Sequence, residues 1–232
     1  MIPLDFTVLD LETTGLNPKT DKIIEIGAIR VRDGKLTEEF STLINPGRKL
    51  EERITELTGI TDEALEHAPS IEEVWPSLLA FLGTDLLVGH RILFDYSFLK
   101  RVAVNQKCSF ERQGIDTLKI ARKCLPDLES RRLPDLCKHY GIPHHAHRAA
   151  DDAVATFRLY EKLGAAFPDA SLFTPEQLLY KAKKESPITK GQKEQLYKLI
   201  EKHRLTIECD IDKLSRNEAS RMADKIRLRY GK

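Results

Sequence analysis

The sequence predicts an α/β domain with a mixed β-sheet, followed by a small helical module. Strand-like segments come first and are followed by alternating strands and helices, an order typical of α/β domains. Two prolines in "FPDASLFTPEQ" interrupt this pattern, and two helix-like segments follow them. The chain of 232 residues has room for one domain of about 170 residues and an appendage. We therefore predict a domain at 1–170, a linker with a short helix at 171–187, and a basic helical module at 188–232.

The first three strands are predicted from apolar patterning and one turn signal. Residues 4–11 have the pattern of a strand, and residues 22–45 contain two more around Asp33-Gly34. That dipeptide between apolar runs favours a tight hairpin turn. The chain is therefore expected to open with an antiparallel meander of three strands.

The helices are predicted from capping residues and periodicity. The segment 70–83 begins with a capping box, Ser70 and Glu73, and ends at Gly83. A short buried strand is expected at 86–90. The other predicted helices of the first domain are 94–106, 116–125, 133–141 and 148–167. Those of the module are 185–203 and 214–230, the second with a capping box at Ser215 and Glu218.

Bulk composition predicts a cytoplasmic protein. The sequence is 41% hydrophobic and 31% charged, as in soluble globular proteins, and has no apolar run long enough to span a membrane. Its first residues lack the features of a secretion signal. The four cysteines are widely and irregularly spaced, which indicates reduced thiols. They are Cys108, Cys124, Cys137 and Cys209.

Charge is distributed unevenly along a chain whose net charge is +1. Residues 174–232 carry 15 Lys and Arg against 9 Asp and Glu, a balance of +6. The remaining residues carry 22 against 27, a balance of −5. A basic segment attached to an acidic domain indicates a polyanionic partner. A lysine-rich helical surface facing water is the alternative.

The stretch "VLDLETTGLN" places two carboxylates at the end of the first predicted strand. Asp10 and Glu12 lie two residues apart, so they project from the same face of a strand. Two carboxylates this close repel each other unless a cation lies between them. With further carboxylates they would form an all-oxygen site for Mg²⁺ or Mn²⁺. The alternative is a strand end at which both side chains face water.

Two later stretches supply further candidates. "GHRILFDYSFL" places Asp95 in the first turn of a helix after a buried strand, and "HRAADDAVAT" places His147, Asp151 and Asp152 at the start of another. His147 can also be an ordinary surface histidine. A zinc site is a further alternative, although its candidate ligands match no familiar zinc spacing. Those ligands are Cys137, His139, His144, His145 and His147.

Taken together, the stretches resemble the DEDDh branch of the DnaQ-like 3′→5′ exonucleases, the family of the proofreading epsilon subunit of bacterial DNA polymerase III. The resemblance covers residues 5 to about 165. Three motifs carry it in order: "DLETTG" with Asp10 and Glu12, "FDYSFL" with Asp95, and "HRAADDA" with His147 and Asp152. The segment "ELTGITDEALEHAP" also resembles the family. Arg91 departs from the pattern, because relatives commonly carry Asn there.

The resemblance implies a ribonuclease H-like fold with a five-stranded mixed sheet flanked by helices. It implies that Asp10, Glu12, Asp95 and Asp152 hold two divalent cations, Mg²⁺ or Mn²⁺, as in two-metal phosphodiester hydrolysis. His147 would be the general base. The expected substrate is the single-stranded 3′ end of a nucleic acid, with DNA favoured and a 5′-nucleoside monophosphate released. Substrate contacts are expected from Thr13, Thr14, Gly15, Leu16 and Phe94.

Two alternatives remain open. The same chemistry could act on RNA, as in the RNase T and oligoribonuclease relatives, because no motif reports a contact with the 2′-hydroxyl group. A catalytically inactive nucleic-acid-binding module is the second alternative, and the complete set of ligand and base positions argues against it. A DNA polymerase or another replication protein is a possible partner, and no membrane association is expected.

Overall fold

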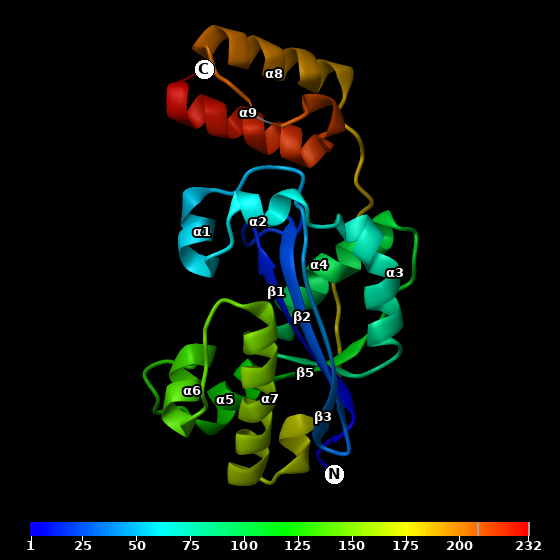
Figure 1. Ribbon diagram of the computed structural model, residues 1–232, viewed down its shortest axis with the longest axis vertical. Helices are drawn as coiled ribbons and strands as arrows, with labels where there is room; N and C mark the ends of the chain where they lie inside the picture. The colour runs from blue at the N-terminus through cyan, green and yellow to red at the C-terminus, as the bar shows by residue number, and fades with distance from the viewer. Residues whose placement is uncertain (208, 232) are drawn as a thin grey trace.

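The computed structural model describes residues 1–207 and 209–231 as an α/β domain with a helical module above one end of its sheet (Figure 1). Glu208 and Lys232, both in the predicted module, lie outside the described residues. The strands are β1 (Phe6–Thr13), β2 (Ile23–Arg32), β3 (Lys35–Leu43), β4 (Leu87–Gly89), β5 (Gln113–Asp116) and β6 (Glu176–Gln177). They form one mixed sheet in the order β3-β2-β1-β4-β5-β6.

The predicted antiparallel meander forms β1, β2 and β3. Asp33 and Gly34 both adopt positive φ angles, 50° and 70°, as a two-residue hairpin turn requires. The short strands β4 and β5 then continue the sheet in parallel with β1. The predicted mixed α/β sheet is therefore confirmed. β1 lies between β2 and β4, and its carboxyl end extends beyond the residues that pair with β4.

The sheet has six strands where five were expected. The additional strand β6 pairs antiparallel with β5 at the edge of the sheet and lies in the predicted linker 171–187. A short 3₁₀ helix, η1 (Ala170–Phe173), begins at the last residue of the predicted first domain and continues into this segment. Phe173 and Leu178 are buried in the cores of the first domain. The chain therefore stays packed against this domain as far as Leu178.

Helices cover both faces of the sheet. Val8 faces a core formed with α5, α6 and α7, whereas Leu9 faces a core formed with α3 and α4. This alternation follows from the strand geometry, in which successive side chains point to opposite faces. The helices of this domain are α1 (Glu52–Thr58), α2 (Asp62–Glu66), α3 (Ile71–Leu82), α4 (Ile92–Asn105), α5 (Thr117–Cys124), α6 (Leu133–Tyr140) and α7 (Ala149–Ala166).

The C-terminal module consists of α8 (Lys190–His203), the 3₁₀ helix η2 (Ile211–Lys213) and α9 (Arg216–Tyr230). Capping boxes start both α-helices, Thr189 with Gln192 and Ser215 with Glu218. The module has its own small core, in which side chains of α8 pack against α9. Within the described ranges no helix is long and apolar enough to cross a membrane.

Candidate active site

Carboxylates from three elements meet at one pocket near the carboxyl end of β1. β1 supplies Asp10 and Glu12, α4 supplies Asp95, and α7 supplies Asp152. Ligand oxygens of Asp10, Glu12 and Asp152 all lie within 4.8 Å of one another. The Asp95 carboxylate is buried, accepts a hydrogen bond from the Leu11 N–H at 3.1 Å, and lines the same pocket. The pocket has a volume of about 220 Å³.

Burial and repulsion from neighbouring carboxylates raise the pKa values of Asp10, Glu12 and Asp95. Burial is the main cause at Asp10, whose pKa lies well above its ordinary value, and Asp95, Asp152 and Glu12 raise it further. Burial also raises the pKa of Glu12 to about 8, with Asp152 adding to the shift. For Asp95, burial raises the pKa and outweighs the hydrogen bonds from backbone N–H groups. Such a cluster of carboxyl oxygens suits a hard divalent cation.

The loop before α7 surrounds Asp152 with polar partners. The backbone N–H of His147 donates to Oδ2 of Asp152 at 2.9 Å, and Nε2 of His144 contacts Oδ1. His147 has a φ of 69°, so the loop turns through a left-handed residue here, and its side chain lines the pocket. His144 was named only as a candidate zinc ligand and not as part of the carboxylate site, because it matches no motif and only the fold of the loop brings it to Asp152.

Of the adjacent aspartates, only Asp152 faces the cluster. Its side chain is buried, whereas the Asp151 side chain is 52% exposed and lies 4.0 Å from His145. Successive residues of an α-helix point about 100° apart, so the two carboxylates cannot share one site. The structure thus brings Asp152 to the carboxylates of β1 and leaves Asp151 in water.

The predicted substrate contacts divide into two groups. Leu16, which is 78% exposed, and Phe94 line the pocket with the carboxylates. Thr13 and Thr14 are buried and support the loop that follows β1. Oγ1 of Thr13 donates to the Gly15 carbonyl at 2.8 Å. Oγ1 of Thr14 accepts hydrogen bonds from the Lys22 N–H and from Arg48, at 3.0 and 2.6 Å.

A further buried carboxylate, Glu25 on β2, holds the start of α7. Its Oε1 accepts hydrogen bonds from the Arg148 guanidinium at 3.0 and 3.2 Å, and its Oε2 accepts one from the Ala149 N–H at 3.0 Å. A Cβ at Gly27 would lie 2.1 Å from the Ala149 backbone, so only glycine permits this close approach. Sequence reasoning missed Glu25. Its signal is an acidic residue in the apolar strand "IIEIGAI".

His90 and Arg91, the residues before α4, also line the pocket. His90 is held between Oγ1 of Thr117 and the Arg131 carbonyl, each at 2.9 Å. Arg91 has a φ of 77°, and its N–H donates to Asp116 at 2.9 Å. Asn tolerates this left-handed conformation better than Arg does. Asn, the residue that the family resemblance leads us to expect here, would therefore be less strained than Arg91.

The sequence matches the family model described as "Exonuclease" over residues 7–160. It is 44% identical over 157 residues to the PolC-type DNA polymerase III of Thermotoga petrophila, a match covering 67% of this chain and 11% of that protein. It is 38% identical over 160 residues to the DNA polymerase III epsilon subunit of Aquifex aeolicus, covering 68% of this chain and 79% of the subunit. The chain thus matches about a tenth of the PolC-type polymerases and most of the epsilon subunit.

Solved structures of exonucleases share the fold. Exonuclease X in complex with 5′ overhanging duplex DNA is 26% identical with a TM-score of 0.59, covering 72% of this chain and 96% of that one. The nuclease domain of 3′hExo, a DEDDh family member bound to rAMP, is 17% identical with a TM-score of 0.63. The match covers 76% of this chain and 98% of that one. This second likeness supports the fold only. From the family match and the identity to the epsilon subunit, we conclude that this chain belongs to the exonuclease family.

Proposed function

We propose that this protein removes nucleotides from the 3′ end of DNA, as an epsilon-like proofreading or repair exonuclease, and releases 5′-nucleoside monophosphates. The observation that carries the proposal is the convergence of Asp10, Glu12 and Asp152 within 4.8 Å, with Asp95 and His147 lining the same pocket. The relatives named as DNA polymerase III proteins and the DNA complex of exonuclease X favour DNA over RNA.

The carboxylates fit a divalent-cation site. They offer only oxygen ligands, and burial together with the negative charge of neighbouring carboxylates raises the pKa values of Asp10 and Glu12. Asp10, Glu12, Asp95 and Asp152 would hold two ions, Mg²⁺ or Mn²⁺. When bound, such ions would supply a water of lowered pKa and stabilise the charge on the leaving 3′-oxygen.

Other residues of the pocket would act on the proton of the attacking water and on the terminal nucleotide. His147 would remove the proton from the attacking water, because an imidazole can exchange protons near neutral pH. Its ring is carried by a loop whose backbone N–H is bonded to Asp152, so base and carboxylate are held together. Leu16 and Phe94 would pack against the terminal nucleotide, where aromatic and apolar side chains bind bases of any sequence.

The cellular setting is part of the same proposal. Several relatives are DNA polymerase III proteins, so a polymerase or another replication protein is a fitting partner. The wide and irregular spacing of the four cysteines fits a reducing cytoplasm.

The test is digestion of matched DNA and RNA oligomers, single-stranded and duplex, with Mg²⁺ or Mn²⁺. A 3′ label should be released at once as a mononucleotide, whereas a 5′ label should persist on a descending ladder of products. DNA should be degraded faster than RNA of the same sequence. Faster degradation of RNA would favour the RNA-directed alternative. No release with either cation would favour an inactive binding module.

A further inference from the structure

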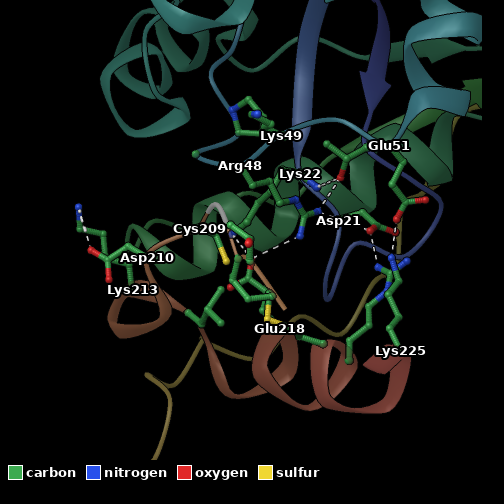
Figure 2. Close-up of a pocket in the computed structure, with 18 residues that line it drawn as sticks. Asp21, Lys22, Arg48, Lys49, Glu51, Cys209, Asp210, Lys213, Glu218 and Lys225 are labelled. Atoms are coloured by element: carbon green, nitrogen blue, oxygen red, sulfur yellow. Dashed lines mark hydrogen bonds and ion pairs between the residues drawn. The ribbon is translucent and has the colours of Figure 1, made fainter. Parts of the chain in front are cut away.

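The C-terminal module contacts the exonuclease domain beside the loop that follows β1. Helix α9 lies over this loop and over residues 46–51 (Figure 1). Between module and domain lies a pocket of about 610 Å³, lined by charged side chains from both (Figure 2). Among the described residues, ion pairs that cross the boundary include Arg221 with Asp21, Lys225 with Glu51, and Glu218 with both Lys22 and Arg48.

Among the acidic partners, Asp21 is built into the loop itself. Its side chain is only 3% exposed. Its Oδ2 accepts a hydrogen bond from the Asn17 N–H at 2.9 Å, and its own N–H donates to the Asn17 carbonyl at 2.8 Å. A Cβ at Gly15 would lie 2.6 Å from Oδ2, so the carboxylate packs directly against this glycine. Asp21 therefore occupies the inside of the loop 14–21.

Two arginines from different parts of the chain reach this loop. Arg221 of α9 donates to Oδ1 of Asp21 and to Oγ1 of Thr20. Arg48 donates to Oγ1 of Thr14 at 2.6 Å and to the Thr20 carbonyl at 2.9 Å, and it lies 3.6 Å from Oδ1 of Asp21. A buried carboxylate needs such partners, because an unpaired charge there is strongly unfavourable. The module thus supplies one of the cations that keep Asp21 in place.

The far side of the same loop belongs to the active site. Leu16 lines the pocket of Asp10 and Glu12, whereas Thr14 lines the pocket beneath α9. The loop therefore forms the wall between the two pockets. A shift of Asp21 would move Gly15 and Asn17, the two neighbours of Leu16, because both are in contact with its carboxylate.

We propose that Arg221 is a positioning residue for substrate binding: through Asp21 it fixes the loop that presents Leu16 to the 3′-terminal nucleotide. This inference rests on the proposed function, since Leu16 needs a nucleotide to bind. The C-terminal module then contributes to the exonuclease site without touching substrate. Its effect is on KM, because the loop contacts the nucleotide and the carboxylates carry out the chemistry.

Helix α9 also offers a matched control. Lys225 bridges the same two parts of the protein, but its partner Glu51 is 45% exposed and lies outside the loop. Exposed ion pairs contribute little to stability. Replacing Lys225 therefore tests a general loss of docking, whereas replacing Arg221 tests the contact with Asp21.

The experiment compares full-length wild-type protein with Arg221→Met, Arg221→Lys and Lys225→Met. Hydrogen exchange reports the loop directly and needs no nuclease activity. We expect the Asn17 amide to exchange about tenfold faster in Arg221→Met, the effect of losing one bond to a charged group. The exchange rate of this amide should be intermediate in Arg221→Lys and unchanged in Lys225→Met. For an oligonucleotide substrate, KM should rise several-fold in Arg221→Met while kcat stays within about twofold.

A second variant, Asp21→Asn, tests the same contact in case the module unfolds in Arg221→Met. Asp21→Asn keeps a hydrogen-bond acceptor for the Asn17 N–H but removes the charge that Arg221 pairs with, and it should reproduce both effects. Equal exchange at Asn17 in Arg221→Met and Lys225→Met would overturn the inference, as would a fall in kcat with KM unchanged. If the wild-type protein proves inactive, the proposed function fails, and the exchange data alone decide the role of Arg221.

Discussion

Glu25 lies directly opposite Glu12 in the β1–β2 hairpin, and its carboxylate binds Arg148 and the first N–H group of α7. Like charges directly opposite each other destabilise an antiparallel pair. In this hairpin the negative charge of Glu25 is balanced by Arg148, the residue that precedes α7. The arrangement ties β2 to the helix that carries Asp152, and it leaves Glu12 as the carboxylate that faces the site.

Loss of the Glu25 charge should therefore loosen α7. We expect Glu25→Gln to lower the free energy of unfolding by about 1–2 kcal/mol, because Arg148 is 57% exposed and water replaces part of the pair. Urea denaturation with Mn²⁺ present measures this, since bound cations remove the repulsion between the other carboxylates. Glu38→Gln is the control. It removes an exposed partner of Arg30 and should change stability by less than about 0.5 kcal/mol. Equal losses in both variants would contradict the role of Glu25.

The stability of the metal-free protein should fall as pH rises. The folded-state pKa of Glu12 is about 8, against 4.5 as its ordinary value, so the folded protein retains a proton that the unfolded chain releases in this range. The stabilisation that comes from protonated Glu12 is then fully present below about pH 4.5 and is lost as pH rises toward 8. Each pKa unit corresponds to about 1.4 kcal/mol, so we expect the wild-type protein to lose several kcal/mol across this window and Glu12→Gln to lose less. Urea unfolding at several pH values measures the slope. Parallel curves for the two proteins would refute the prediction, and added Mn²⁺ should flatten the wild-type curve.

Replacement of the metal-ligand candidates should abolish turnover. Asp10→Ala and Asp152→Asn each remove a carboxylate from the cluster and should leave the fold intact, because each also removes a repulsion. Asp151→Asn is the matched control on the same helix turn and should be mild, since that side chain is 52% exposed. Release of a 3′ label measures the rates. Substantial activity in Asp152→Asn together with its loss in Asp151→Asn would mean that the wrong aspartate is assigned.

The general-base assignment predicts a large loss of rate without loss of metal binding. His147→Ala should slow turnover by about 10²–10⁴-fold. His147→Asn is a second variant, because Asn accepts the φ of 69° at this position with less strain. The control is His145→Ala, whose ring is 90% exposed. Calorimetric titration with Mn²⁺ should give wild-type affinity in all three variants. Weakened binding in both His147 variants would make His147 a metal ligand instead.

The basic surface of the module predicts salt-dependent binding of nucleic acid. Lys190 and Lys198 are exposed on α8, whereas Lys193 is paired with Asp212. We expect the double variant Lys190→Gln/Lys198→Gln to bind single-stranded DNA more weakly. Its plot of log affinity against log salt should be shallower by about 1.4, the loss expected for two phosphate contacts. Fluorescence anisotropy at several salt concentrations measures this slope.

A matched pair on the first domain serves as the control. Lys107→Gln/Lys162→Gln removes the same charge from two other exposed lysines. If the two double variants have the same slope, the module's lysines have no special part in binding. The module would then be better explained as a surface for docking another protein.

The sequence alone determined the features that depend on neighbouring residues. Asp33-Gly34 specifies a tight turn through two left-handed residues, and the capping boxes at Ser70 and Ser215 define helix starts through bonds within one turn. Helical periodicity places apolar side chains on one face of α8, and the core of the module contains them together with side chains of α9. These residues are Leu196, Leu199 and Ile200 of α8 and Ala219, Met222 and Ile226 of α9. The ordered motifs identified the family in the same way, because their spacing is a property of the chain.

Only the tertiary structure decided which distant residues support the site. β5 and β6 are too short to have a pattern of their own, and each is defined by the strand beside it. Glu25 meets Arg148 across 123 positions, and Asp21 meets Arg221 across 200. A buried carboxylate must find a cation wherever the fold brings one, and no local pattern encodes that choice. The catalytic candidates could therefore be predicted from motifs, whereas the residues that hold them in place could not.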